Sequence, residues 1–339
     1  MGGPVRALVF TAPGQVELLD VPEPDPAPGE VLVEVRAAGI CGSELHGARR
    51  PGFRQPPLIM GHEFAGIGAG GEAVVNNPIL SCGRCAECRR GMRHVCRERE
   101  IVGVHRAGGF AERVAVPASA LRPLPPGLPW AAAALIEPAA NAVHAWNQAG
   151  RALGASRDLG GGGDLGNGGD PGAEGARGAR VAVIGCGAIG LLCAATALSG
   201  GAARVEVTDL SSARLAAAQR LGAEVADPGL SGQYDVVIDA VGSAATRAAS
   251  VAHQRPGGVA VWLGLAEEEA GFDANALIRG EKRVLGSFAY RDEEFAQATA
   301  RIGDWDLTWA AGYPLDAAAG IFTDLMNGGL QPLKALLLP

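Results

Sequence analysis

The sequence predicts an α/β protein that combines a β-rich part with a doubly wound parallel sheet. Two observations support this class. Short β-branched runs separated by turn residues occupy the first hundred or so residues, whereas strands and helices alternate after residue 180. The chain has 339 residues, which is enough for two domains that each have a hydrophobic core.

The β-rich part begins with three predicted strands, VRALVF, QVELLDV and EVLVEVR. Turn residues separate them at Ala12-Pro13-Gly14 and along the proline-rich stretch 22–29. Such short runs, rich in β-branched residues and bounded by Gly and Pro, are typical of strands joined by turns.

The alternating part begins with RVAVIGCGAIGLLCAATALS, which reads as a buried strand, a glycine turn and an apolar helix. RVEVTDL, SSARLAAAQRLGA, YDVVIDAVG and GGVAVWLGL continue the alternation. This pattern predicts a parallel sheet covered by helices. From about Phe288 onward we expect helical and turn segments that end in the strand-like KALLLP.

A glycine-rich stretch, 154–178, lies between the two parts. Eleven of its 25 residues are glycine, and Leu159 and Leu165 are its only sizeable apolar side chains. Such a stretch buries too little surface to offset its ordering entropy. We therefore expect a flexible surface insertion, with a functional lid as the alternative.

Charge and composition exclude several classes of protein. The formal net charge of −7 argues against nucleic acid as a partner, because phosphate binding needs a basic face. The most apolar run, WAAAALIEPAANAVHAW, is interrupted by Glu137 and Pro138, so we expect no membrane span. No signal peptide is visible, and seven cysteines in such a chain indicate thiols in a reducing compartment. We therefore expect a cytoplasmic protein.

Four cysteines have the spacing of a metal site. Cys82, Cys85, Cys88 and Cys96 follow the pattern C-x2-C-x2-C-x7-C. Four converging thiolates close a tetrahedron around zinc and leave no open position, which indicates a structural ion. An iron–sulfur cluster or a redox pair is the alternative, and the short, arginine-rich loop favours zinc.

A second set of possible ligands is spread along the chain. Cys41 is followed 21 residues later by His62 and Glu63, and Glu137 comes much later. One thiolate, one imidazole and one carboxylate suit a catalytic zinc, which keeps a position for water or substrate. Taken singly, each residue has an ordinary structural explanation, so the hypothesis depends on their occurring together.

The glycine turn after residue 184 has the context of a dinucleotide site. Its cofactor-binding candidates are Gly185, Gly187, Ala188, Ile189, Gly190, Asp209 and Arg214. The glycines follow a predicted strand and open a helix, so backbone N–H groups can approach a pyrophosphate. Asp209, 19 residues after Gly190, would accept hydrogen bonds from the ribose and repel a 2′-phosphate. NAD is therefore favoured over NADP, although Arg214 lies nearby.

These motifs together resemble the zinc-dependent medium-chain alcohol dehydrogenase family, in its polyol (sorbitol) and threonine dehydrogenase-like branch. The resemblance covers nearly the whole chain and rests on CGSELH, GHEFAG, NPILSCGRCAEC, GGFAERVAVP, IEPAANAVHA, VIGCGAIGLL, TDLSSARL and LGSF. It implies a GroES-like catalytic domain and a Rossmann domain. The expected ranges are 1–150 for the first part of the catalytic domain, 151–179 for the insertion, 180–287 for the Rossmann domain and 288–339 for the return to the catalytic domain.

The resemblance also implies roles for individual residues. Cys41 and His62 match zinc ligands, Glu63 matches a carboxylate that binds the metal directly or by exchange with water, and Glu137 falls at the third ligand. Ser43 matches the hydroxyl that touches the substrate oxygen, and His46 matches the outer end of a proton relay. The implied cofactors are two zinc ions per chain and NAD.

We therefore expect a soluble homo-oligomer, a dimer or tetramer, that transfers a hydride from a secondary alcohol to NAD. The alcohol would be a polyol, a cyclitol or a sugar-derived compound. A threonine-type dehydrogenase and a catalytically silent member of the fold are the alternatives.

Two local departures from the family pattern affect the expected zinc site. Glu44 stands where the family usually has Asp, and its extra methylene is expected to shift a hydrogen bond beside the metal. The segment after GHE, which includes Gly71-Glu72-Ala73-Val74, is shorter than usual and is expected to loosen the wall beside His62.

Overall fold

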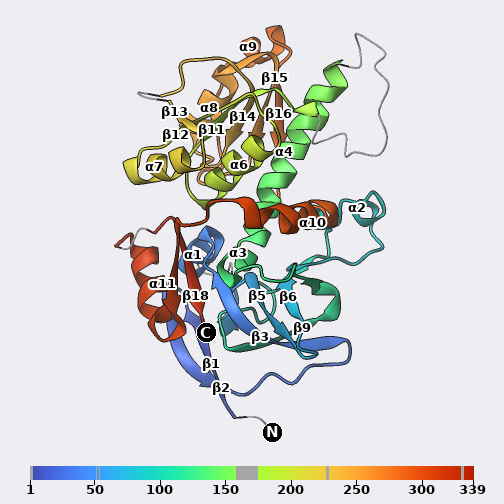
Figure 1. Cartoon of the computed structure of the whole chain (residues 1–339), viewed down its shortest axis with the longest axis vertical. Coiled ribbons are helices and arrows are strands. Elements are labelled where there is room, and N and C mark those ends of the chain that lie inside the picture. Colours follow the sequence, from blue (N-terminus) through green and yellow to red (C-terminus); the bar gives the residue numbers. More distant parts are fainter. Residues whose placement is uncertain (1–2, 51, 53, 158–174, 227–228, 330–331) are drawn as a thin grey trace. The chain divides into compact units, whose positions relative to one another are not determined.

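The computed structural model describes the chain except for residues 1–2, 51, 53, 158–174, 227–228 and 330–331 (Figure 1). The chain forms two compact units. The first contains Met1–Glu137 and Arg291–Pro339, and the second contains Pro138–Tyr290. The two end segments of the chain therefore build one unit, and the middle segment builds the other.

Antiparallel pairing dominates the first unit. Its described strands are β1 Val5–Ala12, β2 Gln15–Val21, β3 Glu30–Gly39, β4 Leu58–Ile59, β5 Glu63–Gly68, β6 Ala73–Asn76, β7 Ile79–Leu80, β8 Glu100–Ile101, β9 Arg113–Pro117, β10 Leu121–Pro123, β17 Ala310–Pro314 and β18 Lys334–Leu338. A seven-stranded sheet has the order β10-β6-β5-β3-β18-β17, with β9 also paired to β3. Smaller sheets have the orders β2-β1-β4 and β7-β8. These strands confirm the β-rich part that the sequence predicted.

Short helices complete the first unit. They are α1 Gly42–Arg49, α2 Ala86–Arg89, α3 Trp130–Ala134, α10 Asp292–Arg301 and α11 Ala318–Asn327, with 3-10 turns η1 Arg93–Val95, η2 Ala118–Ala120, η3 Ile302–Asp304 and η4 Leu315–Ala317. The buried side chains of β1, β3 and β5 pack with those of α11 in one hydrophobic core. Phe110 and Phe322 meet edge to face in this core, with ring centroids 6.4 Å apart. The core joins segments from both ends of the chain.

The second unit is a parallel sheet with helices. Its strands are β11 Arg180–Ile184, β12 Arg204–Thr208, β13 Glu224–Val225, β14 Tyr234–Asp239, β15 Gln254–Trp262 and β16 Arg283–Gly286. Its helices are α4 Ile136–Arg157, which begins within the first unit, α6 Ala188–Ser199, α7 Ser212–Arg220, α8 Ala244–Ala252 and α9 Ala274–Arg279. The strand order β13-β12-β11-β14-β15-β16, with all neighbours parallel, is the 3-2-1-4-5-6 order of a doubly wound dinucleotide-binding sheet. The predicted Rossmann sheet is confirmed.

The helix α4 changes the boundary expected from the sequence. Residues 138–150 were assigned to the catalytic domain and 151–157 to the insertion, but all of them belong to α4 and to the second unit. Trp146 and Leu153 on this helix are buried, and a Cβ at Gly200 would lie 2.6 Å from Trp146 Nε1. This packing against the end of α6 accounts for the helix. The central part of the predicted flexible insertion, 158–174, lies outside the described residues.

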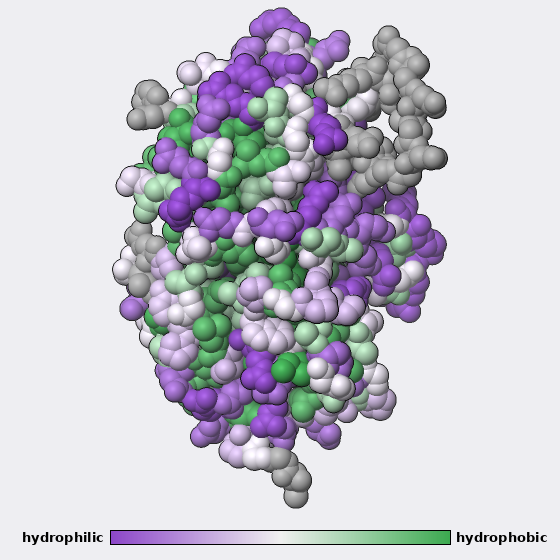
Figure 2. Space-filling view, in the orientation of Figure 1, coloured by the Kyte–Doolittle hydropathy of each residue, from purple (hydrophilic) through white to green (hydrophobic). Residues whose placement is uncertain are grey.

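The surface is mostly polar on the face shown in Figure 2, with hydrophobic residues in smaller groups among the polar ones. Large hydrophobic side chains that remain exposed include Leu210, Leu265 and Ile278. Within the part of the chain that the structure describes, no helix is both long and apolar enough to cross a membrane.

Candidate metal centres and cofactor site

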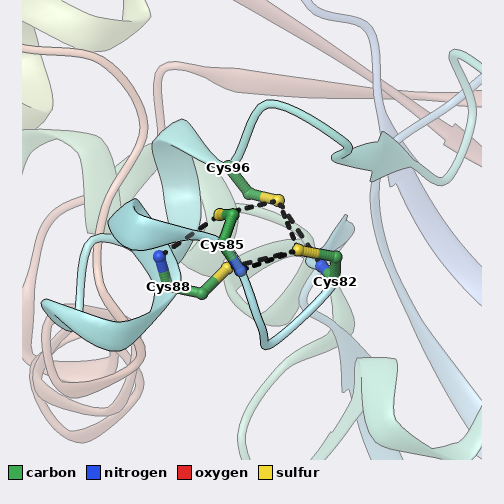
Figure 3. Close-up of side chains that lie close together, drawn as sticks. All are labelled: Cys82, Cys85, Cys88 and Cys96. Carbon is green, nitrogen blue, oxygen red and sulfur yellow. Dashed lines mark hydrogen bonds between the residues drawn. The ribbon is translucent and has the colours of Figure 1, made fainter.

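Four cysteine sulfurs converge in the loop that carries α2 (Figure 3). The Sγ–Sγ distances are 3.5 Å for Cys82–Cys96, 3.8 Å for Cys85–Cys96 and 4.0 Å for Cys82–Cys88. Zn–S bonds of about 2.3 Å in a tetrahedron place the sulfurs about 3.8 Å apart, whereas a disulfide needs about 2.0 Å. The spacing therefore fits four thiolates around one tetrahedral ion.

Backbone N–H groups point at these sulfurs. Cys85 N donates to Cys82 Sγ at 3.4 Å, and Cys88 N donates to Cys85 Sγ at 3.5 Å. The backbone N–H groups of Arg84 and Cys85 lower the pKa of Cys82 to about 7. These N–H groups therefore favour the thiolate form of Cys82, whereas burial and the neighbouring side chains raise the pKa of Cys85 to about 12.

Strand register brings the second ligand set together. β3 ends at Gly39, which pairs with Glu63 at the start of β5. Cys41 follows β3, and His62 precedes β5, so both lie at the same edge of the sheet. One ligand atom from each of Cys41, His62 and Glu63 lies within 4.8 Å of the others, and His62 and Glu63 are buried. A thiolate, an imidazole and a carboxylate at this separation can bind one metal ion.

Glu44 orients His62 in this cluster. The fully buried Glu44 carboxylate lies 2.9 Å from His62 Nδ1 and accepts hydrogen bonds from the backbone N–H groups of Cys41, Gly61 and His62. Burial lowers the pKa of His62, but the Glu44 carboxylate and the Cys41 thiolate raise it to well above its ordinary value. Because Nδ1 faces Glu44, Nε2 is the nitrogen left for a metal. The Glu44 side chain, one methylene longer than aspartate, thus contacts the histidine ring directly.

Lys334 forms an ion pair with Glu63 inside the same cluster. Leu336 of β18 pairs with Gly39 of β3, which places Lys334, at the start of β18, beyond the end of β3. Lys334 and Glu63 form a buried ion pair, with side chains 5% and 1% exposed. A Cβ at Gly39 would lie 2.2 Å from Glu63 Oε2 and 3.0 Å from Lys334 Cε, so glycine leaves room for the pair.

The short hairpin between β5 and β6 contacts the backbone of His62. Gly68 and Glu72 close its turn with a backbone hydrogen bond of 2.9 Å. Asn76, at the end of β6, donates from Nδ2 to the His62 carbonyl oxygen at 3.0 Å. The structure therefore supplies a contact to His62 that the sequence did not indicate.

The remaining sequence-predicted site residues take separate positions. Ser43 and His46 are exposed and lie three residues apart on α1, so they share one face of that helix. Glu137 is buried near the start of α4 and is not a member of the close cluster of Cys41, His62 and Glu63.

The glycines after β11 have three different structural roles. Gly185 has φ +90°, and a Cβ there would lie 2.4 Å from Val241 Cγ2. A Cβ at Gly190 would lie 1.7 Å from the Gly185 carbonyl oxygen, whereas one at Gly187 would meet nothing within 4 Å. Gly185 thus makes the tight turn, Gly187 leaves room for a ligand, and Gly190 allows the helix to pack closely, which are the features of a pyrophosphate-binding turn. Ala188 and Ile189 are the first residues of α6.

Asp209 links this turn to the end of β12. Its Oδ2 accepts a hydrogen bond from Cys186 N at 2.6 Å, and its Oδ1 accepts one from Ser211 N at 2.8 Å. Arg214 Nη1 lies 3.7 Å from Asp209 Oδ2. The carboxylate is therefore held beside the glycine turn, and an exposed guanidinium on α7 lies near it.

Sequence reasoning missed Lys334, Asn76 and Arg54 as parts of the cluster around His62. A compositional signal was available for Lys334. The chain has only two lysines, and this one begins an otherwise apolar strand. Asn76 and Arg54 carry no comparable signal, because their contacts depend on the tertiary fold.

Comparison with known proteins identifies the family. Residues 27–126 match the alcohol dehydrogenase GroES-like domain, and residues 188–304 match the zinc-binding dehydrogenase domain. The chain belongs to the zinc-dependent medium-chain alcohol dehydrogenase family, as the sequence motifs indicated. It is an oxidoreductase of a family whose members use zinc and a nicotinamide cofactor.

Individual relatives are similar along most of their length. The chain is 33% identical to a D-altritol 5-dehydrogenase of Agrobacterium fabrum, covering 84% of both chains. It is also 33% identical to an L-threonine 3-dehydrogenase of Streptomyces avermitilis, covering 80% of both. A crystal structure of a zinc-binding dehydrogenase from Sinorhizobium meliloti bound to NADP matches with a TM-score of 0.87, 28% identity and full coverage of both chains.

Proposed function

We propose that the protein oxidises a secondary alcohol of the polyol, cyclitol or sugar-derived class to the ketone and transfers the hydride to NAD. The observation that carries the proposal is the close cluster of Cys41, His62 and Glu63 in a chain that also contains a pyrophosphate-type glycine turn. The relative named D-altritol 5-dehydrogenase supports this substrate class.

The donor atoms of the cluster fit a catalytic zinc. Cys41 Sγ, His62 Nε2 and a Glu63 oxygen would hold the ion, with Glu137 as a further carboxylate from the start of α4. Zinc at this position would lower the pKa of a bound alcohol and stabilise negative charge on its oxygen. The four cysteines around α2 would hold a second, structural zinc.

The chain's own residues supply the proton route. The Ser43 hydroxyl would accept the proton of the substrate alcohol, and His46 would carry it to solvent. Both side chains are exposed on one face of α1, directly after Cys41, so the helix that begins at the metal ligand also presents the relay.

An L-threonine dehydrogenase activity is the second candidate, because a relative of equal identity carries that name. A panel of polyols, cyclitols, sugar acids and L-threonine, assayed with NAD by absorbance at 340 nm, separates the two. We expect turnover with a hydroxylated carbon chain and little with L-threonine. Turnover confined to L-threonine would replace the proposed substrate class.

Asp209 supports NAD as the cofactor. Replacing Asp209 by asparagine keeps one acceptor oxygen, for either the Cys186 or the Ser211 amide, and removes the charge that would bind the ribose hydroxyls. We expect kcat/KM for NAD to fall roughly 10- to 100-fold, because hydrogen bonds to charged groups contribute about 1.5–3 kcal/mol each. The value for NADP should change little or rise. Equal losses with both cofactors in steady-state assays would remove the argument for NAD, and Arg214→Ala serves as a control on the neighbouring charge.

We also propose a cytoplasmic homo-oligomer. None of the seven cysteines forms a disulfide, which suits a reducing compartment. Strand β16 is the edge strand at one side of the described six-stranded sheet. The segment between β15 and β16 carries three exposed hydrophobic side chains, Leu265, Phe272 and Ile278. A second copy would cover such an edge. Light scattering on the purified chain tests this, and a monomer at micromolar concentration would contradict it.

A further inference from the structure

We propose that Arg54 is a positioning residue of the zinc site, because it joins the start of α1 to the loop that packs on the His62 backbone. The inference rests on the proposed function, since the site that it positions is the proposed catalytic zinc site. Arg54 is only 3% exposed and comes from the segment before β4. It acts through the residues that would hold the metal and is not itself one of the proposed ligands.

The guanidinium binds two backbone carbonyls from separate segments. Arg54 Nη1 donates to the Gly103 carbonyl oxygen at 2.8 Å, and Nη2 donates to the Ser43 carbonyl oxygen at 3.4 Å. A guanidinium presents several N–H donors in a fixed fork, so it can hold two acceptors in one geometry. The contact to Ser43 fixes the first turn of α1, directly after Cys41.

The loop that contains Gly103 connects Arg54 to His62, because it packs against the backbone at His62. Gly103 has φ +80°, and a Cβ there would lie 2.5 Å from the Gly61 carbonyl oxygen and 2.9 Å from His62 N. The loop is therefore in direct contact with the peptide that precedes His62. Arg54 thus connects the Cys41 side and the His62 side of the cluster through two short paths.

Charge gives an independent reason for a cation at this place. The Arg54 guanidinium interacts electrostatically with the Glu44 carboxylate and the Cys41 thiolate. Its Nε has no hydrogen-bond partner among the described residues. Burial lowers the pKa of Arg54, and the negative charges of Glu44 and then Cys41 oppose this effect. Removing Arg54 would leave Glu44 and Cys41 without this cation.

The test compares metal affinity at the two sites in the full-length protein. Arg54→Met, Arg54→Lys and, as a matched control, Arg49→Met at the exposed end of α1 are titrated with Zn²⁺ and Co²⁺. The absorption of Co²⁺ reports the ligand set of each site. We expect Arg54→Met to weaken metal binding at the Cys41 site by about tenfold or more, as other outer partners of metal ligands do. The four-cysteine site should keep its metal, and kcat should fall more than KM rises.

Arg54→Lys keeps the positive charge but lacks the paired N–H donors of the guanidinium. We therefore expect it to recover part of the metal affinity that Arg54→Met loses at the Cys41 site. Arg49→Met should match the unchanged protein. The proposal is overturned if Arg54→Met binds metal at the Cys41 site within twofold of the unchanged protein. It is equally overturned if both sites lose metal together and lysine gives no rescue, because that result indicates a role in the fold alone. Metal binding is measured without an alcohol, so this result does not depend on whether the proposed reaction is found.

Discussion

Replacing Cys41 by serine is expected to abolish alcohol oxidation while NAD binding and the four-cysteine metal site persist. Cys41 belongs to the close cluster, and its replacement removes one of the three proposed zinc ligands. We expect kcat to fall about a thousandfold or more, because a metal ion stabilises transition-state charge by several kcal/mol. Steady-state kinetics with the best substrate of the panel measures the loss.

Cys193→Ser is the matched control for this change. Cys193 is buried in α6, and burial raises the pKa of its thiol to about 12, so it is a packed thiol and not a ligand. The control should retain turnover and lose only some stability. Activity close to normal in Cys41→Ser would show that the cluster is not the catalytic metal site.

Replacing Lys334 by methionine is expected to destabilise the first unit strongly. The substitution leaves the Glu63 carboxylate buried without its cation, and breaking a buried pair in this way costs about 3–5 kcal/mol. We expect the melting temperature of the first unit to fall by roughly 10 °C, since each kcal/mol corresponds to about 2–4 °C in domains of this size. Differential scanning calorimetry of the metal-free protein measures the shift.

The chain provides its own control for Lys334. Lys282, the only other lysine, is half-buried in the second unit and donates to the Val251 carbonyl oxygen at 2.8 Å. Lys282→Met should cost about 1 kcal/mol, the usual net value of one hydrogen bond. The double variant Lys334→Met with Glu63→Gln should recover part of the stability lost in Lys334→Met. Equal losses of melting temperature in Lys334→Met and Lys282→Met would contradict a stabilising buried ion pair.

Features that depend on neighbouring residues were predicted well from the sequence. The cysteine spacing and the glycine turn are local patterns, because successive residues of one loop carry the chemistry. The strands of both units follow from β-branched runs and from the alternation of strand and helix. The sequence also indicated Cys41, His62 and Glu63, and the pairing of Gly39 with Glu63 shows why they meet.

Features that depend on long-range pairing were not predicted. Lys334 reaches Glu63 only because β18 pairs with β3, and no local pattern shows that pairing. Residues 151–157 were assigned from the sequence to the insertion, because they lead into the glycine-rich stretch. They form the end of α4, and the burial of Leu153 depends on tertiary packing that composition does not show. The contacts of Glu44 also needed the structure, because its carboxylate meets His62 Nδ1 and three backbone N–H groups from two segments; the shift expected from its extra methylene stays a prediction.

The most direct test of the central claim is the zinc content per chain of the purified protein, measured by elemental analysis. The proposed function requires two zinc ions, one in the four-cysteine loop and one at the cluster of Cys41, His62 and Glu63. Two zinc ions per chain, falling to one in Cys41→Ser, is the predicted result. A single zinc ion in the unchanged protein, with no loss in Cys41→Ser, would contradict a catalytic metal at Cys41.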